Sequence, residues 1–175
     1  MKRTLFYFFK TIAIFSRIFR RRNLYMYFLT KAHSFNGVTF SGKPRFIHPS
    51  AVLDATANIV LGDNIVISMG ALFLTHDYSY TVGLKAINEK PQTDIAIVLP
   101  IKVGDDCFIG ANSIILPGTV IGSNVIIGAG SVVKGVIPDF SGISGNPAKI
   151  ITDIRDWARI KKETVDQKSL LNDKR

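Results

Sequence analysis

The sequence has a single cysteine, Cys107, among 175 residues. One cysteine cannot form an intramolecular disulfide, so a disulfide-stapled fold is excluded and the reducing cytoplasm is the expected compartment. The sequence also lacks clusters of cysteine, histidine and carboxylate residues at the spacing of metal ligands, so we expect no metal. It therefore predicts a fold held by an apolar core, for which 47% hydrophobic residues are sufficient.

Acidic residues are missing from residues 1–53, which contain ten basic ones. The basic residues are Lys2, Arg3, Lys10, Arg17, Arg20, Arg21, Arg22, Lys31, Lys43 and Arg45. The rest of the chain carries 12 basic and 13 acidic side chains, so the net charge of +9 belongs to the N-terminal segment. Such a local positive charge indicates an anionic surface such as lipid, and no nucleic acid is expected as a partner.

No apolar run in this segment is long enough to span a membrane. The stretch from Leu5 to Phe19 is interrupted by Lys10 and Arg17, and no signal-peptide cleavage site follows it. An aromatic-rich helix with basic flanks is typical of the membrane interface. Residues 1–24 are therefore expected to contact an anionic membrane surface. A helix that packs on the rest of the protein or on a neighbouring subunit is the alternative.

An aliphatic residue returns at every sixth position in the second half of the chain, at Val103, Ile109, Ile115, Ile121, Ile127 and Val133. A helix repeats at 3.6 residues and a strand at 2, so this period fits neither element alone. It predicts a strand that bends at fixed intervals into triangular coils of about 18 residues, which stack as parallel strands. A sandwich would need hairpin turns, which this block lacks.

Two further features define the predicted coil. Glycine follows most of the aliphatic residues and is expected to supply the backbone freedom of a tight corner. The residues four positions after each aliphatic one are small or medium and are expected to face inward; they are Cys107, Ser113, Thr119, Val125 and Ser131. A thiol in this phase is packing rather than a nucleophile, so an acyl-cysteine is not expected.

A shorter block with the same period precedes the regular one. Its two series are offset by two residues, which indicates an irregularity near Ile59; they are Ile47, Leu53 and Ile59, then Leu61, Ile67 and Phe73. The predicted fold is all-β, a parallel β-helix between two helical ends. The predicted parts are a basic, mainly helical arm over residues 1–45, the β-helix over residues 46–151 with a protruding loop at 77–99, and a C-terminal helix and tail over residues 152–175.

The repeat resembles the left-handed β-helix of the hexapeptide-repeat acyltransferases. The similarity runs from "LGDN" and "THDYSY" to "IGAGSVV", "IPDF" and "SGNPAKII". The galactoside, maltose and surface-polysaccharide O-acetyltransferases are the subgroup that it resembles most. The resemblance implies acetyl-CoA as donor, a sugar or glycan acceptor, and a homotrimer in which the donor lies between two subunits.

The chain has three histidines that could act as a base. His33 and His48 lie in no motif and are expected at the surface or in local hydrogen bonds. His76 closes the first block directly before the loop. The resemblance of "THD" implies that His76 is the general base that removes the proton of the acceptor hydroxyl. Asp77 beside it is expected to orient or stabilise the imidazole.

The resemblance also implies a coenzyme A site along the β-helix. Ala111 and Ala129 match positions whose backbone contacts the pantetheine arm. Lys149 in "GNPAK" matches a basic position near the nucleotide phosphates. Lys134 matches another cofactor contact, one place earlier than in many relatives, and Phe108 matches a position beside the acyl group. The predicted acceptor contacts on the loop are Tyr78, Tyr80 and Lys85.

The function that these features favour is an acetyl-CoA-dependent O-acetyltransferase. It would modify a sugar hydroxyl of a surface polysaccharide or of its lipid-linked precursor. We expect it in the cytoplasm, held peripherally at the inner face of the cell membrane. N-acetylation of an amino sugar nucleotide and a non-catalytic β-helix that binds or scaffolds are the alternatives. Serine acetyltransferase is disfavoured, because the sequence shows no match to its large helical N-terminal domain.

Overall fold

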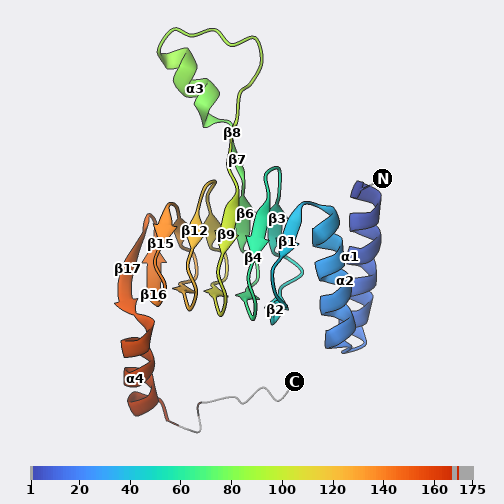
Figure 1. Cartoon of the computed structure of the whole chain (residues 1–175), viewed down its shortest axis with the longest axis vertical. Helices are drawn as coiled ribbons and strands as arrows, with labels where there is room; N and C mark the ends of the chain where they lie inside the picture. The colour runs from blue at the N-terminus through green and yellow to red at the C-terminus, as the bar shows by residue number, and fades with distance from the viewer. Residues whose placement is uncertain (1, 167–168, 170–175) are drawn as a thin grey trace.

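The chain forms a column of stacked triangular coils with helices at both ends, seen in a computed structural model that describes residues 2–166 and 169 (Figure 1). Two helices cover the first coil, one projects on a loop and one follows the last coil. Their bounds are α1 (Lys2–Ile18), α2 (Arg22–Phe35), α3 (Ser79–Ala86) and α4 (Ile154–Thr164). The end of the predicted C-terminal tail, residues 167–168 and 170–175, lies outside the described residues.

Three sheets form the sides of the column. The first sheet consists, in spatial order, of β1 (Val38–Phe40), β4 (Ile59–Leu61), β9 (Ile101–Val103), β12 (Val120–Ile121) and β15 (Val136–Ile137). The second consists of β17 (Ala148–Asp153), β16 (Ser141–Gly145), β13 (Ile126–Ile127), β10 (Phe108–Ile109), β5 (Val66–Ile67) and β2 (Phe46–Ile47). The third consists of β14 (Val132–Val133), β11 (Ile114–Ile115), β6 (Leu72–Leu74) and β3 (Val52–Asp54).

The strand register confirms the stacked coils. Paired residues lie 18 positions apart through most of the regular block, as Phe108 and Ile126 do, and 16 apart in its last coil, as Val120 and Val136 do. They lie 20 apart in the first block, as Val52 and Leu72 do, so the irregularity predicted near Ile59 is two extra residues. All pairs within the stack are parallel except β16 with β17, which is antiparallel. The predicted parallel β-helix is confirmed.

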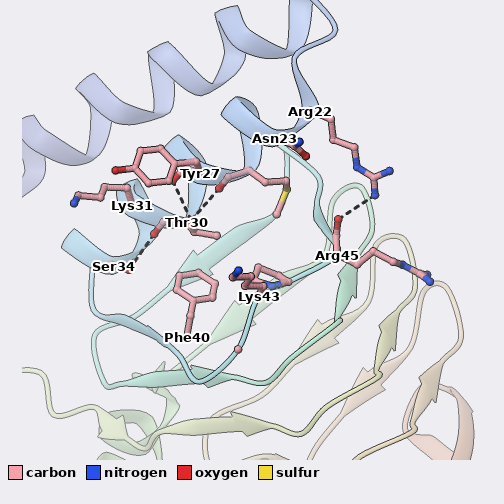
Figure 2. A pocket seen from close by; sticks show the side chains of 12 residues that line it. Arg22, Asn23, Tyr27, Thr30, Lys31, Ser34, Phe40, Lys43 and Arg45 are labelled. Atoms are coloured by element: carbon pink, nitrogen blue, oxygen red, sulfur yellow. Dashed lines mark hydrogen bonds between the residues drawn. The ribbon is translucent and has the colours of Figure 1, made fainter. Parts of the chain in front are cut away.

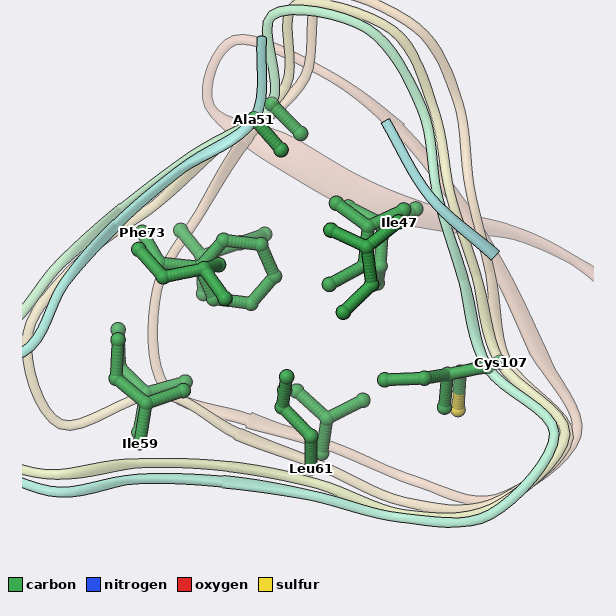
Figure 3. Close-up of a cluster of buried hydrophobic side chains, with 14 of the residues drawn as sticks. Ile47, Ala51, Ile59, Leu61, Phe73 and Cys107 are labelled. Atoms are coloured by element: carbon green, nitrogen blue, oxygen red, sulfur yellow. The ribbon is translucent and has the colours of Figure 1, made fainter. Parts of the chain in front are cut away.

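The core is the inside of the triangle (Figure 3). Every aliphatic residue of the six-residue series is at most 4% exposed, and so is each small residue four positions later. Ile47, Leu61 and Phe73 of the first block point into the same interior. Cys107 is buried as predicted, and its Sγ donates to the carbonyl of Gly122 at 3.1 Å.

The repeat glycines were predicted to supply backbone freedom at the corners, and the structure shows a different role for them. At one corner the left-handed conformation is adopted by Asn64, Asp106 and Asn124, with φ of 52°, 54° and 56°; short polar side chains tolerate this conformation. Gly104 is required for a different reason. An added Cβ there would lie 2.7 Å from the carbonyl carbon of Gly122 in the next coil. The repeat glycine therefore permits close stacking of coils rather than a special φ.

The N-terminal arm packs on the first coil. The hydroxyl of Tyr25 on α2 donates to the carbonyl of Ile47 at 2.5 Å, and Leu29 is fully buried. Within the range predicted as the arm, β1 pairs with β4 and belongs to the column. α2 thus behaves as the packing helix of the alternative prediction, whereas α1 packs on α2 and lies at the end of the column (Figure 1).

The other two histidines, His48 and His33, lie away from the inserted loop and differ in their contacts. His48 makes the local hydrogen bond that was predicted, with its Nδ1 2.7 Å from Oγ of Ser50. His33 corrects the expectation of a surface or locally bonded residue. It is buried beneath the Phe6 ring, and its Nδ1 has no hydrogen-bond partner among the described residues. Burial, and then the charge of Lys10, lowers the pKa of His33 to about 4.

Candidate active site

His76 stands where the inserted loop leaves the column. It begins β7 (His76–Asp77), which pairs antiparallel with the returning strand β8 (Ile97–Val98). The segment between them projects from the side of the column and carries α3 (Figure 1). Coil partners on either side of this insertion lie 42 residues apart, as Ile59 and Ile101 do. The insertion leaves the stacking intact and places an accessible histidine at its base.

A carboxylate from the preceding coil lies beside the imidazole. Oδ2 of Asp54 is 3.2 Å from Nδ1 of His76, with the two side chains 36% and 28% exposed. Oγ1 of Thr56 lies 3.3 Å from the same nitrogen. The Asp54 carboxylate favours the tautomer with its proton on Nδ1, so the lone pair of Nε2 is available to accept a proton. A base oriented in this way suits the deprotonation of a hydroxyl group.

Buried Thr75 fixes the backbone that carries this pair. Its Oγ1 donates to the carbonyl of Asp54 at 2.8 Å and accepts the amide N–H of Ala57 at 2.9 Å. Its own carbonyl accepts the amide N–H of Leu99, which ends the insertion, at 2.9 Å. One side chain thus ties the two turns that present Asp54 and His76.

Sequence reasoning missed Asp54 because it placed the orienting role on the neighbouring Asp77. The signal was present in the offset of the first block. With 20 residues per coil there, Asp54 pairs with Leu74, two positions before His76. Without that register, Asp54 is a carboxylate at the end of a short strand.

The two residues that follow His76 have different contacts: Asp77 binds the start of α3, and Tyr78 packs against the imidazole. The Asp77 carboxylate accepts the amide N–H of Ser79 at 2.8 Å, at the start of α3. This hydrogen bond lowers the pKa of Asp77, and the charges of Lys134 and His76 lower it further. The Tyr78 ring meets the His76 ring edge to face, with centroids 5.6 Å apart. The loop therefore covers one side of the imidazole with an aromatic ring.

The predicted donor residues divide between two corners of the column. Ala111 and Ala129 turn the same corner in successive coils, where the Gly130 amide N–H donates to the Ala111 carbonyl at 2.8 Å. From there β11 runs to the next corner, which is the corner of His76. Lys134, directly after β14, lies at that second corner, close enough to affect the pKa of Asp77. The base and the two alanines are thus separated by one side of the triangle.

The other predicted contacts are accessible. Phe108 on β10 is 41% exposed, and Lys149 on β17 is exposed beside its partner Ser144. Tyr80 and Lys85 are exposed on α3. Of the three predicted acceptor contacts, the structure brings Tyr78 to His76 and leaves Tyr80 and Lys85 on the projecting helix.

Residues 2–166 and 169 contain neither a candidate metal centre nor a candidate membrane span. Over that range, no group of three or more histidine, cysteine, aspartate or glutamate residues could hold a metal ion. No helix in the same range is both long and apolar enough to cross a bilayer.

A column of stacked coils built from six-residue repeats defines the class of hexapeptide-repeat β-helices. Residues 100–135 match the family described as "Bacterial transferase hexapeptide (six repeats)". This block of the chain therefore belongs to the hexapeptide-repeat transferase family.

Relatives of known name agree with this assignment. The chain is 35% identical over 124 residues to YJL218W of Saccharomyces cerevisiae, a protein named as an acetyltransferase, with 63% of each chain covered. A maltose O-acetyltransferase from Clostridium difficile 630 is 31% identical with a TM-score of 0.55, covering 68% of this chain and 60% of that one. A galactoside acetyltransferase solved in complex with coenzyme A shares the fold, with 24% identity, a TM-score of 0.61, and 90% and 83% covered. The chain spans 46–64% of the length of the first curated relatives that it matches.

Proposed function

We propose that the protein is an acetyl-CoA-dependent O-acetyltransferase that modifies a sugar hydroxyl. The observation that carries the proposal is the pair formed by Asp54 and His76 at the base of the inserted loop. A β-helix that only binds or scaffolds has no need of a histidine whose Nδ1 is held by a carboxylate. The names of the relatives, which include a maltose O-acetyltransferase, support acyl transfer to a sugar.

The residues of the pair have complementary roles in the reaction. Nε2 of His76 takes the proton of the acceptor hydroxyl while its oxygen attacks the thioester carbonyl carbon of acetyl-CoA. The Asp54 carboxylate stabilises the resulting imidazolium. When the carbon–sulfur bond breaks, His76 returns the proton to the leaving thiolate. The products are the acetyl ester and free coenzyme A, and the histidine is restored to its neutral state.

Transfer is direct in this proposal, without an acyl-enzyme. Cys107 is the sole thiol, and it lies inside the column at 2% exposure. Burial raises the pKa of the Cys107 thiol to about 11, so the nucleophilic thiolate is scarce near neutral pH.

The division of the site between two corners supports a homotrimer. Ala111 and Ala129 lie at a different corner from His76, so a donor held on the alanines of one subunit would reach the histidine of a neighbour. The outer face of the first sheet also exposes Val120 by 39% and Val136 by 76%, and exposed aliphatic residues of this kind suit a subunit interface. In this arrangement Lys149 lies near the nucleotide phosphates and Phe108 beside the acyl group.

The acceptor in this proposal is a surface polysaccharide or its lipid-linked precursor. Tyr78, Tyr80 and Lys85 on the loop would contact it, with Tyr78 already against the base. We place the reaction on the cytoplasmic side of the membrane. The single reduced thiol of Cys107 supports this location.

An acetyl-transfer screen tests the function. The full chain is incubated with acetyl-CoA and a panel of oligosaccharides and nucleotide sugars, and products are read by mass spectrometry. The expected result is an acceptor that gains one acetyl ester, together with release of coenzyme A. Gain of the acetyl group on an amino nitrogen instead would establish N-acetylation, and no transfer to any sugar would overturn the proposal.

A further inference from the structure

An apolar stripe runs along the outer face of α1. Its residues recur at the spacing of one helix face, continue into the turn after the helix at Phe19, and are between 41% and 72% exposed; they are Tyr7, Phe8, Ile14, Phe15, Ile18 and Phe19. Exposed aromatic and aliphatic side chains in one continuous stripe are unusual for a helix in water. This stripe is the inverse of the pattern of a surface helix, which buries its apolar face.

The opposite face of α1 already has a partner in the chain. Phe9 stacks on Phe28 and Phe35 of α2, with centroids 6.1 and 5.5 Å away, and Ala13 is fully buried. The Phe6 ring covers His33. α1 is therefore anchored to the column through its inner face, and its stripe is left uncovered by the described part of the chain.

Basic residues flank the stripe. Arg3, Lys10 and Arg17 recur at intervals of seven, so they form a row along one edge of the helix. Arg20 and Arg21 lie in the turn that follows, and both are exposed. No acidic residue occurs before Asp54, so this charge has no compensation in the segment.

Four further basic residues lie on α2 and on the segment beneath it. A cavity of about 720 Å³ opens between α2 and the segment that joins β1 to β2 (Figure 2). The basic residues that line it are Arg22, Lys31, Lys43 and Arg45. With Lys2, all ten basic residues of the segment lie on the hairpin or around this cavity, so positive charge is concentrated at one end of the column.

We propose that the α1–α2 hairpin, residues 2–35, binds the surface of an anionic lipid bilayer. α1 lies parallel to the membrane. Its aromatic stripe lies at the boundary between lipid headgroups and acyl chains, and its basic row lies against lipid phosphates. This placement holds the column at the membrane without a spanning segment. It would bring the catalytic site close to a lipid-linked acceptor, although the binding itself does not depend on the proposed activity.

Charge decides between lipid and a second copy of the chain as the occupant of this face. Two hairpins that met face to face would bring eight basic residues against eight more, which repel each other. An anionic leaflet attracts the same charges and also accepts the apolar stripe. The lipid surface is therefore complementary in both properties.

Vesicle sedimentation tests the proposal. The full chain is mixed with vesicles of phosphatidylcholine, with or without phosphatidylglycerol, at low and high salt. We expect binding that requires phosphatidylglycerol and weakens at 1 M salt, where the Debye length falls to about 3 Å. Absence of binding to phosphatidylglycerol vesicles at low salt would overturn the proposal.

Two pairs of matched double variants separate the contribution of the apolar stripe to vesicle binding from that of the basic charge. Phe15→Ser with Phe19→Ser removes part of the stripe, and Val82→Ser with Ile87→Ser removes equally exposed apolar side chains on the loop. The first double variant is expected to bind vesicles at least tenfold more weakly, and the second to bind as the unaltered chain does. Equal binding by both would contradict insertion of the stripe.

The charge variants follow the same design. Arg20→Gln with Arg21→Gln is compared with Lys161→Gln and Lys162→Gln on α4, which change the net charge equally. Each arginine removed is expected to weaken binding about fivefold, the equivalent of ~1 kcal/mol. Equal losses in both variants would show a nonspecific charge effect and overturn the proposal.

The stripe variants also report on self-association. If Phe15→Ser with Phe19→Ser changed the sedimentation coefficient of the assembly, the stripe would be an interface between copies and the lipid proposal would fail. Acetyl transfer to a soluble acceptor should stay unchanged in every variant of the hairpin. Failure of lipid binding is thereby distinguished from failure of the proposed activity.

Discussion

Nδ1 of His76 lies 3.2 Å from Oδ2 of Asp54, although the two residues belong to successive coils. Asp54 ends β3 and His76 follows β6, and these strands are neighbours in the third sheet. The pair exists only when the coils stack in register. The same hydrogen bonds that build the column therefore build the candidate base.

The structure predicts that Asp54 orients His76. Asp54→Asn removes the charge that stabilises the imidazolium, so kcat should fall by about 10²-fold, while KM for acetyl-CoA stays close to its original value. Steady-state kinetics of purified Asp54→Asn measure this. Asp77→Asn is the matched comparison, because its carboxylate instead accepts the Ser79 amide N–H. A larger loss of kcat in Asp77→Asn would contradict the assignment.

Cys107 should be dispensable for catalysis. Cys107→Ala removes a buried sulfur, so the free energy of unfolding should fall by about 1 kcal/mol, with turnover essentially unchanged. Turnover and urea unfolding of the variant measure both effects. Complete loss of transfer in a folded Cys107→Ala protein would show that an acyl-cysteine intermediate is part of the reaction.

Active sites between subunits predict complementation. His76→Ala lacks the base, and Ala129→Trp blocks the corner where the donor is proposed to lie, so each alone should be inactive. In randomly mixed trimers about a quarter of the interfaces combine an intact His76 with an intact Ala129. Activity should therefore return to about a quarter of the original after the two are unfolded and refolded together. If the mixture stays inactive, each site lies within one subunit.

Buried His33 predicts a pH-dependent stability. Its pKa is about 4 in the folded chain and near 6.5 when unfolded, so the unfolded state binds more protons between these values. The free energy of unfolding should fall as the pH drops from 6.5 to 4, by up to about 3 kcal/mol. Urea unfolding at several pH values measures the slope. His33→Leu should flatten it over this range, and an unchanged slope would place its origin elsewhere.

The six-residue period was sufficient to predict the column and its core. Each aliphatic residue of the series and each small residue four positions later occupies the interior, because the period of the sequence equals the length of one side of the triangle. Cys107 could be placed inside by phase alone. His76 could be located from its position at the end of a block, before a segment that breaks the period.

The remaining features depend on contacts between coils or between elements, which a local pattern does not contain. Asp54 meets His76 only through the 20-residue register of the first block. Gly104 has ordinary backbone angles, and the requirement for glycine comes from Gly122 in the next coil. His33 is buried because α1 folds back over α2, and no signal in the sequence around His33 indicates this.

The most direct test of the account is the turnover of His76→Ala with the acceptor that the acetyl-transfer screen identifies. The account predicts that kcat falls by roughly 10²–10⁴-fold, the usual contribution of a general base, while thermal unfolding stays as in the unaltered protein because the histidine side chain is partly exposed. Turnover in His76→Ala equal to that of the unaltered protein would contradict it.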